Sequence, residues 1–549
     1  MECHCIPYTK LPEASALYIN YLYHFDLLSP FYGSGSPFEL ASYQNVSGTV
    51  DYSQALRSEI VRILTHQNEA FGAGEATREN LRRLSQAGTL AVVTGQQVGF
   101  FSGPAFTLYK ALTAIRLAQW LSGHGIESVP VFWLATEDHD LEEVASIKVL
   151  DDNYNSVRLS DSGVRPAPQC SVGYVRLSEG VTGPLASLEA ALPPGEARDQ
   201  LLGDLRRAYR PGAGWGDAFA KFIARIFKRW GVILLDALDP DLHRLAVPAY
   251  VKAIEASPDL TGRLMKRSQG LVDAGFHAQV HVGPESTLIF GARERNRLPL
   301  RSADSGRSFK LEGGERISSE ELQSWAATRP EEITPNDLFR PLVQDLLLPT
   351  VAYVAGPAEL AYHAQSAVLY PAFERPQPVI FPRTSFTLID PRAERLLNKY
   401  HLAVDDAWQG EAHLRRRIAA AGFSEGWEER LAGSEREIAQ SLERLQSDVE
   451  SIDPTLLHAL ERARQRTEHQ FERLKGKITR AAFAGSEVLR RHEQMLARFL
   501  TPDGHPQERG LGGVYFLGRA GYDLLDRLLE LISLEVPDHR VVPFQYALA

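Results

Sequence analysis

The chain contains little cysteine: Cys3, Cys5 and Cys170 are the only three among 549 residues. So few thiols exclude a disulfide framework and are typical of a reducing compartment. The sequence also lacks an uninterrupted apolar run of the ~18 residues that a membrane span needs. Its opening stretch, MECHCIPYTKLPEAS, lacks the basic-then-apolar layout of a signal peptide. These absences predict a cytoplasmic protein with no membrane partner.

An excess of positive charge is missing as well. Lysine and arginine number 59 against 69 aspartate and glutamate residues, which gives a net charge of −10. Nucleic-acid binders normally carry a basic field, so we expect no nucleic-acid partner. Cys3-His4-Cys5 suggests a metal site, but residues so close together cannot readily close a tetrahedral zinc site, and no second CxxC or HxxxH follows. We therefore expect a frayed terminus there and no metal.

What the chain does contain is an alternation of short apolar runs and helical segments over residues 1–390. Such runs, joined by helices, are typical of βαβ units, so the sequence predicts an α/β protein with a parallel-sheet core. Two stretches break the pattern, near 151–216 and 280–345, and are expected to be insertions. HAQVHV and STLIFGARERNRLPLRS alternate apolar and polar residues, as antiparallel strands do. The expected core strands are 90–95, 129–136, 231–237 and 348–356, and residues 377–390 close this part of the chain.

The pattern of apolar and polar residues changes after residue 390. Apolar residues recur there at spacings of 7, 4, 3, 4 and 3, which is a coiled-coil seam. Asp453-Pro454 predicts a helix stop and restart, and a second helical stretch runs to about Leu500. We expect an antiparallel coiled-coil domain over 391–505 that forms a homodimer, and a segment 506–549 that packs back on the core. The seam residues are Leu431, Ile438, Leu442, Leu445, Val449 and Ile452.

The first candidate site is TGQQVGFFSGPAFTLYK, which leaves an expected strand and enters a helix near Pro104. Backbone N–H groups at a helix start bind anions, and glycines let the backbone approach a ligand. Thr107 and Lys110 would add a hydroxyl and a positive charge for a phosphate or carboxylate. The alternative is a glycine-rich connector with a solvated lysine. The candidate binding residues are Thr94, Gly95, Gln96, Gln97, Gly99, Ser102, Gly103, Pro104, Thr107 and Lys110.

The second candidate site is TEDHD, directly after the next expected strand. Glu137, Asp138, His139 and Asp140 are costly to bury without a purpose, and they offer a general base, metal ligands or a partner for an ammonium group. We therefore take them as catalytic candidates. One alternative is an acidic helix start that favours the helix dipole. Another is a metal-dependent phosphoester hydrolase.

The first helix start is repeated: GPAFTLYKA at Gly103 returns as GPAELAYHA at Gly356. Architecture explains the shared residues, because glycine permits the turn and proline suits the first helical position. It does not explain why one start carries Lys110 and the other Glu359 with His363. We predict that the two loops lie at the ends of two strands of one sheet and face a shared cleft. Further candidates are Tyr362 and, after an apolar run, Arg383 and Ser385, although Arg383 is equally typical of a surface residue.

The motifs TGQQVGFFSGPAFTLYK, VPVFWLATEDHD, GPAELAYHAQ and PQERG together resemble the BshC family of bacillithiol biosynthesis, over nearly the whole chain. The resemblance implies a Rossmann-type core related to nucleotidyltransferases, with connecting-peptide insertions and a dimerising coiled coil. It also implies ATP-dependent addition of L-cysteine to glucosaminyl-malate through an activated cysteine carboxyl. The HIGH signature of nucleotidyltransferases is replaced here by GPAFT, and only residues 383–385 stand in for KMSKS.

The resemblance also assigns roles. ATP, with Mg²⁺ at its phosphates, would meet residues 103–110, and ADP would bind a second pocket at Gln507, Glu508 and Arg509. Asp138 or Glu137 would hold the cysteine ammonium, His139 would take the proton of the attacking amine, and Arg383 would hold a malyl carboxylate. A non-catalytic nucleotide-binding scaffold is the remaining alternative.

Overall fold

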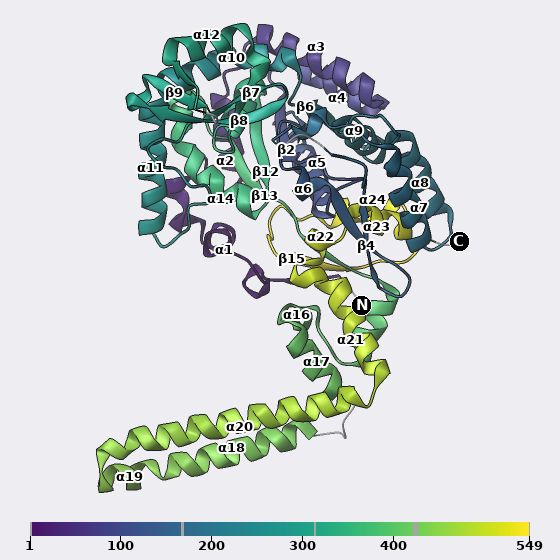
Figure 1. The fold of residues 1–549 in the computed structure, drawn as a ribbon, viewed down its shortest axis with the longest axis vertical. Coiled ribbons are helices and arrows are strands. Elements are labelled where there is room, and N and C mark those ends of the chain that lie inside the picture. Colours follow the sequence, from purple (N-terminus) through teal and green to yellow (C-terminus); the bar gives the residue numbers. More distant parts are fainter. Residues whose placement is uncertain (1–2, 166–168, 312–313, 421–426, 548–549) are drawn as a thin grey trace. The chain divides into compact units, whose positions relative to one another are not determined.

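The computed structural model describes residues 3–165, 169–311, 314–420 and 427–547 (Figure 1). The chain forms two compact units. The core unit comprises the chain up to Asp152, Ser156–Leu388 and the chain from Glu508 onward. The helical unit comprises Asn153–Asn155 and Ile389–Gln507. None of the helices in the described ranges is long and apolar enough to cross a membrane.

The core unit is built on a five-stranded sheet in which every pair of neighbours is parallel. The strand order β13-β12-β2-β3-β6 starts at β2 in the middle, grows through β3 and β6, then returns to β12 and β13 on the other side. The order therefore reverses between β2 and β12, and such reversals are where open parallel sheets bind ligands. The strands are β2 (Leu90–Gln96), β3 (Ser128–Leu134), β6 (Ile233–Asp236), β12 (Thr350–Ala355) and β13 (Val379–Pro382).

The two GPA helices follow the two strands at this reversal: α5 (Phe106–Gly123) follows β2, and α14 (Pro357–Ser366) follows β12. Right-handed crossovers in opposite directions place such helices on opposite faces of the sheet. The packing agrees: Val92 and Val354 pack in one buried cluster with Leu117 of α5. The adjacent residue of each strand, Val93 in β2 and Tyr353 in β12, lies in the other cluster with α14.

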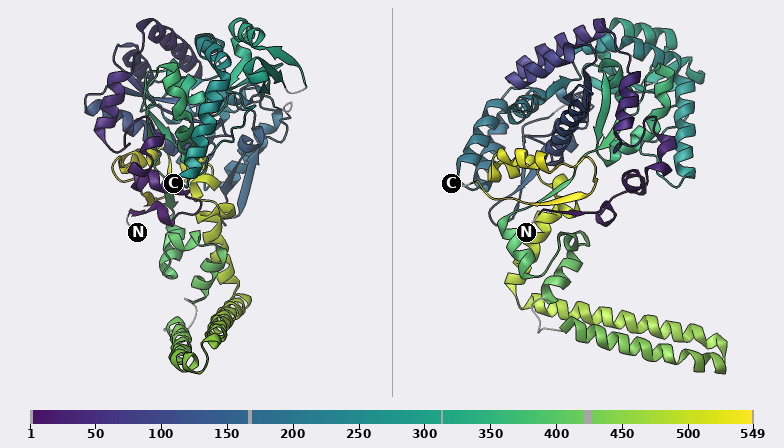
Figure 2. Two further views of the ribbon diagram at one scale, coloured as in Figure 1. Left: turned by 90° about the vertical axis from the view of Figure 1, so that its left-hand side faces the viewer. Right: turned by 180° about the vertical axis from the view of Figure 1, so that it is seen from behind.

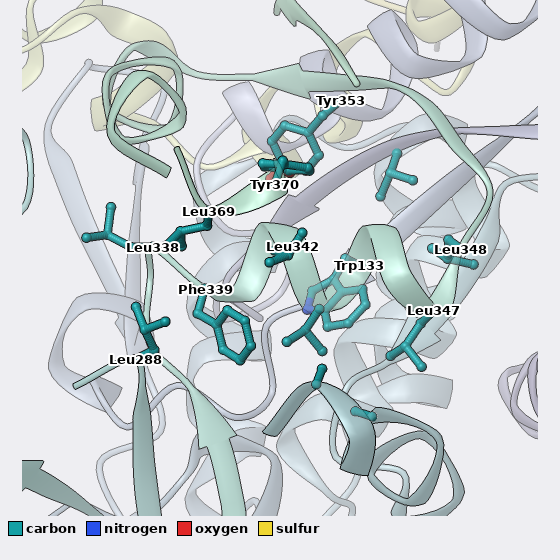
Figure 3. Close-up of a cluster of buried hydrophobic side chains, with 14 of the residues drawn as sticks. Trp133, Leu288, Leu338, Phe339, Leu342, Leu347, Leu348, Tyr353, Leu369 and Tyr370 are labelled. Atoms are coloured by element: carbon teal, nitrogen blue, oxygen red, sulfur yellow. The ribbon is translucent and has the colours of Figure 1, made fainter. Parts of the chain in front are cut away.

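The larger of these clusters joins the sheet to the segment before β12. Trp133 of β3 and Tyr353 of β12 pack beside α13 (Arg340–Leu347), in one cluster with Leu342 of α13 and Phe339 just before it (Figure 3). These side chains are at most 3% exposed. Burial of an aliphatic or aromatic side chain contributes about 1.5–3 kcal/mol, so the cluster fixes α13 against the sheet. This packing places Arg340, the first residue of α13, near Trp133 of β3 and Tyr353 of β12.

The two expected insertions differ in structure. The first begins with an antiparallel pair, β4 (Ser146–Leu150) and β5 (Ser156–Ser160), and continues with helices. The second is an antiparallel sheet of order β10-β9-β8-β7-β11. STLIFGARERNRLPLRS supplies its β7 (Ile289–Arg293) and β8 (Asn296–Ala303), but HAQVHV is not a strand. Instead, Val280 is hydrogen-bonded to the Gln365 side chain of α14. Gln365 Oε1 accepts the Val280 N–H (2.8 Å) and Gln365 Nε2 donates to the Val280 carbonyl (2.9 Å), so a side chain replaces the partner strand.

Helices surround these sheets, and the remaining strands are short. The N-terminal helices are α1 (Ala16–Tyr23), α2 (Leu40–Thr49), α3 (Gln54–Phe71) and α4 (Glu75–Ser85). Those of the two insertions and their flanks are α6 (Leu141–Val144), α7 (Thr182–Ala191), α8 (Glu196–Ala208), α9 (Trp215–Ile226), α10 (Pro240–Glu255), α11 (Ser257–Asp273) and α12 (Ser319–Thr328). The short strands of the second insertion are β9 (Ser308–Leu311), β10 (Arg316–Ser318) and β11 (Ile333–Pro335).

The C-terminal segment lies on the core. Its strand β15 (His539–Pro543) stands between β1 (His4–Ile6) and β14 (Phe386–Ile389) in a three-stranded sheet. The Cys-His-Cys stretch is therefore a paired strand, and the expected fraying is wrong for His4 and Cys5. The helices of this segment are α22 (Gln507–Gly510), α23 (Gly513–Ala520) and α24 (Asp523–Leu531).

The helical unit contains the expected helix pair (Figure 1 and Figure 2). α18 (Trp427–Arg444) and α20 (Leu457–Ala484) run side by side, and Lys475 Nζ lies 2.9 Å from Glu435 Oε2 across the pair. Asp453 accepts the Thr455 N–H, so the predicted restart is confirmed. The second stretch is not one helix to Leu500, because it breaks at Gly485 and Ser486. The other helices are α15 (Pro391–Lys399), α16 (Val404–Trp408), α17 (Glu411–Ala420), α19 (Gln446–Ile452) and α21 (Glu487–Leu500).

Candidate functional site

Lys110 lies at the reversal of strand order, where β2 and β12 end. Its side chain is 3% exposed. Nζ donates to the Gly95 carbonyl (2.7 Å) and to Gln96 Oε1 (3.0 Å), both at the end of β2. It also forms an ion pair with Glu359 of α14. The lysine is therefore buried between the two GPA loops, and the alternative of a solvated lysine is wrong.

Glu359 is the anion around which this end of the sheet is organised. Its carboxylate accepts the Gly356 N–H (2.7 Å) and the Tyr353 hydroxyl (2.7 Å), and it pairs with Lys110. Burial alone would raise the pKa of this carboxyl, but Lys110 and the two other donors hold the pKa below its usual value. The two loops thus meet at the ends of β2 and β12, whereas the shared cleft between them stays a prediction. Their charges, however, neutralise each other directly.

A second buried ion pair lies beside the first. The Arg383 guanidinium donates to Glu508 Oε1 at 2.6 Å, and both side chains are less than 10% exposed. Glu508 also accepts the Phe386 N–H at 3.2 Å. Arg383 is therefore not a surface residue. A Cβ atom on Gly356 would lie 3.7 Å from Arg383 Nε and 3.8 Å from Lys110 Cε, so the two cations converge on this glycine.

The start of α5 does not offer the open anion site that its sequence predicts. The C-terminal segment covers it: the Leu511 carbonyl accepts the Ala105 N–H (2.9 Å), and the Gly513 N–H donates to the Gly103 carbonyl (3.1 Å). Pro104 pairs with Gly512 as an isolated β-bridge, and the Ser102 hydroxyl accepts the Val514 N–H. The backbone polarity that a ligand would use is already satisfied.

The glycines and hydroxyls of this loop serve packing. A Cβ on Gly99 would lie 2.6 Å from Gly103 Cα, and Gly103 itself has a φ of +65°. These glycines therefore permit a close approach within the chain. Thr107 is 1% exposed and faces Gly103, and the Thr94 hydroxyl donates to the Val354 carbonyl, joining β2 to β12. Thr107 Oγ1, however, has no hydrogen-bond partner among the described residues, so a ligand contact at this loop stays a prediction.

The TEDHD residues point to different partners. Asp138 accepts the Gln97 side-chain amide (2.6 Å) and the His139 N–H (2.7 Å), which joins this loop to the end of β2. Asp140 accepts the Glu143 N–H and caps α6, so the acidic helix start explains this residue. His139 Nδ1 is buried 3.7 Å from Asp138 Oδ1, with no hydrogen-bond partner among the described residues. In the described ranges, no three His, Cys, Asp or Glu side chains are grouped to hold a metal ion.

Glu137 turns away from its neighbours and is buried, at 6% exposure. Its Oε1 lies 3.5 Å from Nε2 of His243 on α10. Burial raises the pKa of Glu137 to about 8, although Arg297 and Arg340 act in the opposite direction. His243 could not be predicted from the sequence, because a single histidine inside an amphipathic helix carries no local signal.

Arg340 and the aromatic residues of α14 complete the surroundings. Arg340 donates to the Tyr362 hydroxyl (3.2 Å) and lies over the Trp133 ring at 5.9 Å. His363 is fully buried between the Tyr353 and Tyr362 rings. Burial and the nearby Arg340 hold the pKa of His363 well below its usual value, so its imidazole is neutral. Arg340 was also missed, because a lone arginine at a helix start is usually solvated.

The remaining candidates are engaged elsewhere. The Ser385 hydroxyl lies 2.7 Å from His539 Nδ1, which joins β14 to β15. Gln507 belongs to the helical unit, where it donates to the Phe499 carbonyl (3.1 Å). Glu508 pairs with Arg383, and Arg509 is exposed. These contacts give Glu508 a place beside the first candidate site, and they do not indicate a separate nucleotide pocket.

Comparisons with known proteins cover nearly the whole chain. The family model described as the N-terminal Rossmann-like domain of bacillithiol biosynthesis BshC matches residues 1–384, and the corresponding C-terminal coiled-coil domain matches residues 386–544. Three curated relatives carry the name "Putative cysteine ligase BshC". The Solibacter usitatus protein is 36% identical over 99% of this chain and 100% of its own length. The Koribacter versatilis protein is 34% identical (98% and 99%), and that of Salinibacter ruber 32% (98% and 98%).

Proposed function

The chain belongs to the BshC family of bacillithiol biosynthesis, and on this premise we propose that it is a cysteine ligase. The reaction joins the carboxyl of L-cysteine to the amine of glucosaminyl-malate with consumption of ATP. The C–N bond of an amide forms, the bond from the activated carboxyl carbon to its leaving oxygen breaks, and the amine loses a proton. The family names support the ligase class, and the substrates and the use of ATP are our proposal.

The observation that carries this proposal is the set of charges at the strand reversal. Lys110 and Arg383 converge on Gly356, and α14 begins there with its N–H groups. A helix start with two cations is suited to a phosphate or carboxylate. The Glu359 carboxylate already receives Lys110, Gly356 N–H and Tyr353, so these donors are arranged for an anion. The phosphates of ATP would take the place of the carboxylates that these cations now meet, Glu359 at Lys110 and Glu508 at Arg383.

ATP supplies the leaving group that activates the cysteine carboxyl. In the proposed reaction, Lys110 and Arg383 orient and neutralise the phosphates, with Mg²⁺ as their counter-ion. Asp138 has two acceptor oxygens and a side chain that is 28% exposed, which suits the cysteine ammonium. His139 takes the proton of the attacking amine, because its side chain is 38% exposed and Asp138 lies next to it.

Direct assay of the purified protein tests the reaction. The protein is incubated with L-cysteine, glucosaminyl-malate, ATP and Mg²⁺, and the amide product is measured by mass spectrometry. The nucleotide product is measured in parallel, because AMP and ADP report different modes of activation. Omission of each substrate is the control. We expect the amide only with all components, and an absence of amide with every nucleotide tested would contradict the proposal.

A cellular experiment tests it independently. Low-molecular-weight thiols of a deletion strain are labelled with a thiol-reactive fluorophore, and the strain is complemented with wild type or His139→Ala. We expect bacillithiol to vanish, glucosaminyl-malate to accumulate, and only the wild type to restore the thiol. Persistence of bacillithiol in a deletion strain without a second gene copy would exclude the ligase function. The divergent contacts of Glu137, Asp138 and Asp140 give no support to the phosphoester hydrolase alternative.

A further inference from the structure

Glu137 and His243 reach each other because they follow adjacent strands. Glu137 comes three residues after β3, and His243 lies on α10, which follows β6. β3 and β6 are parallel neighbours, so their carboxyl ends lie side by side. The two side chains are 8% and 2% exposed, and Glu137 Oε1 is 3.5 Å from His243 Nε2. Two buried titratable groups thus face each other beside the candidate site.

The other ring nitrogen fixes the tautomer of His243. Nδ1 lies 3.1 Å from the Ile333 carbonyl oxygen, which can only accept a hydrogen bond. Nδ1 therefore carries a proton and donates it, and the Tyr250 hydroxyl lies 3.3 Å away on the same side. Burial lowers the pKa of His243 to about 4, so the ring is neutral. A neutral ring with a proton on Nδ1 presents a lone pair at Nε2, which has no hydrogen-bond partner among the described residues and lies 3.5 Å from Glu137 Oε1.

The charges around the pair do not supply Glu137 with a cationic partner. Arg297 of β8 donates to Thr334 Oγ1 at 3.0 Å and to the Pro335 carbonyl. Its guanidinium lies over the Phe290 ring at 4.0 Å. Arg340 is directed to Tyr362 and Gln344. Both cations face Glu137 from a distance, without an ion pair to it among the described contacts.

Acidic groups face the pair as well. Asp236 of β6 and Asp138 raise the pKa of Glu137 further, in addition to burial. Glu331 and Asp239 act on His243 from the segment before β11 and from the start of α10, but burial outweighs them. A carboxyl group that is buried, lacks a cationic partner and has other acidic groups nearby retains its proton.

We propose that His243 is a positioning residue for Glu137: its Nε2 lone pair accepts the carboxyl proton, so that Glu137 stands at the site as a neutral acid. A neutral carboxyl cannot hold an ammonium group by charge. The role of binding the cysteine ammonium, for which Glu137 and Asp138 are equal candidates by sequence, then falls to Asp138. This last assignment rests on the proposed function, whereas the state of the Glu137–His243 pair does not.

Infrared difference spectroscopy of the purified full chain tests the pair without any substrate. A buried neutral carboxyl group gives a carbonyl stretching band that disappears when it ionises. We expect a band present at pH 7 and lost above pH 9, absent from Glu137→Gln and shifted in frequency in His243→Gln. Asp345→Asn is the matched control, because Asp345 is another buried carboxyl, with its pKa raised to about 6 by burial. The control should leave the pH 7–9 band in place.

Two results would overturn the proposal that neutral Glu137 donates a hydrogen bond to His243. Identical spectra of wild type and Glu137→Gln would mean that Glu137 is already ionised at pH 7. An unchanged band frequency in folded His243→Gln would mean that Nε2 does not contact the proton. If His243→Gln does not fold, Tyr250→Phe replaces it, because loss of the hydroxyl beside Nδ1 alters the basicity of the same ring. No shift in that folded variant would count equally against the proposal.

Kinetics test the assignment of the ammonium. The KM for L-cysteine should rise at least about tenfold more in Asp138→Asn than in Glu137→Gln, since only the former loses a charge. A larger KM effect in Glu137→Gln would overturn the assignment. A wild type that is inactive with L-cysteine would instead refute the proposed function and leave the infrared result valid.

Discussion

Lys110 of the first GPA helix and Glu359 of the second form an ion pair across the strand reversal of the parallel sheet. The two helices pack on opposite faces of the sheet, so this pair is made over the ends of β2 and β12. The repeated motif therefore places opposite charges at equivalent helix starts. Because the starts of α5 and α14 lie close together, the charges of Lys110 and Glu359 meet.

Removal of one partner of this pair should cost more than removal of both. Lys110→Met leaves the Glu359 carboxylate buried with two neutral donors, and loss of one partner of a buried pair typically costs about 3–5 kcal/mol. The double variant Lys110→Met/Glu359→Gln should recover most of that loss. Denaturant unfolding of the four proteins gives the coupling free energy. Additive effects of the two substitutions would contradict the pairing.

Gly356 should be intolerant of a side chain in function and tolerant in folding. Its φ of −78° suits any residue, so alanine causes no backbone strain. The new methyl group would lie 3.3 Å from Glu359 Oε2 and between Lys110 and Arg383. We expect kcat/KM for ATP to fall about tenfold or more, with an unchanged melting temperature. Gly48→Ala is the control, because no atom lies within 4 Å of its Cβ. Equal activity of the two variants would exclude a ligand at Gly356.

The stability of the protein should depend on pH through Glu137. Its pKa is about 8 in the folded chain, against 4.5 for an ordinary glutamate, so the folded state holds one more proton between these values. Stability from this group is complete below pH 4.5 and declines by about 1.4 kcal/mol per pH unit up to pH 8. Glu137→Gln lacks this decline. Its unfolding free energy relative to wild type should therefore rise between pH 5 and pH 8, and a flat difference would contradict the raised pKa.

The helical unit should form a homodimer through its apolar seam. Ile438, Leu445 and Ile452 are 41%, 47% and 76% exposed within one chain, although their spacing is that of a coiled-coil seam. Ile438→Glu/Leu445→Glu should therefore convert a dimer into a monomer of 61.0 kDa. Sedimentation velocity measures the mass. Val272→Glu is the control, because Val272 is 53% exposed on the core unit. A wild type that is already monomeric would exclude the dimer.

Local sequence patterns were sufficient to predict the strands of the core sheet. The four expected strands 90–95, 129–136, 231–237 and 348–356 all lie in one parallel sheet, because each run is apolar on both sides and a parallel sheet is covered on both faces. Residues 377–390 divide between β13 of that sheet and β14 of the three-stranded sheet. The same reasoning failed for HAQVHV, whose alternation suits a strand. The side chain of Gln365, far away in the sequence, satisfies the backbone of Val280 instead.

The sequence predicted where the charged residues of the site lie, but not which residues they pair with. Lys110, Glu359 and Arg383 lie together at the strand reversal, and the sequence placed each after a strand. The charge that each one meets was not predictable. Two residues of the C-terminal segment supply these partners. The Leu511 carbonyl accepts a hydrogen bond from the start of α5, and Glu508 pairs with the Arg383 guanidinium. His243 and Arg340 were missed for the same reason, since their partners are distant in sequence.

The sequence by itself determined the parallel-sheet core, the coiled-coil helices, the family, and the strand ends at which polar residues collect. These follow from periodicity and local motifs, which depend on near neighbours along the chain. Only the tertiary structure decided that Lys110 faces Glu359, that Arg383 faces Glu508, and that Glu137 faces His243. Burial and the charge of a partner set the protonation and the availability of each group. Both depend on segments that meet only when the chain folds.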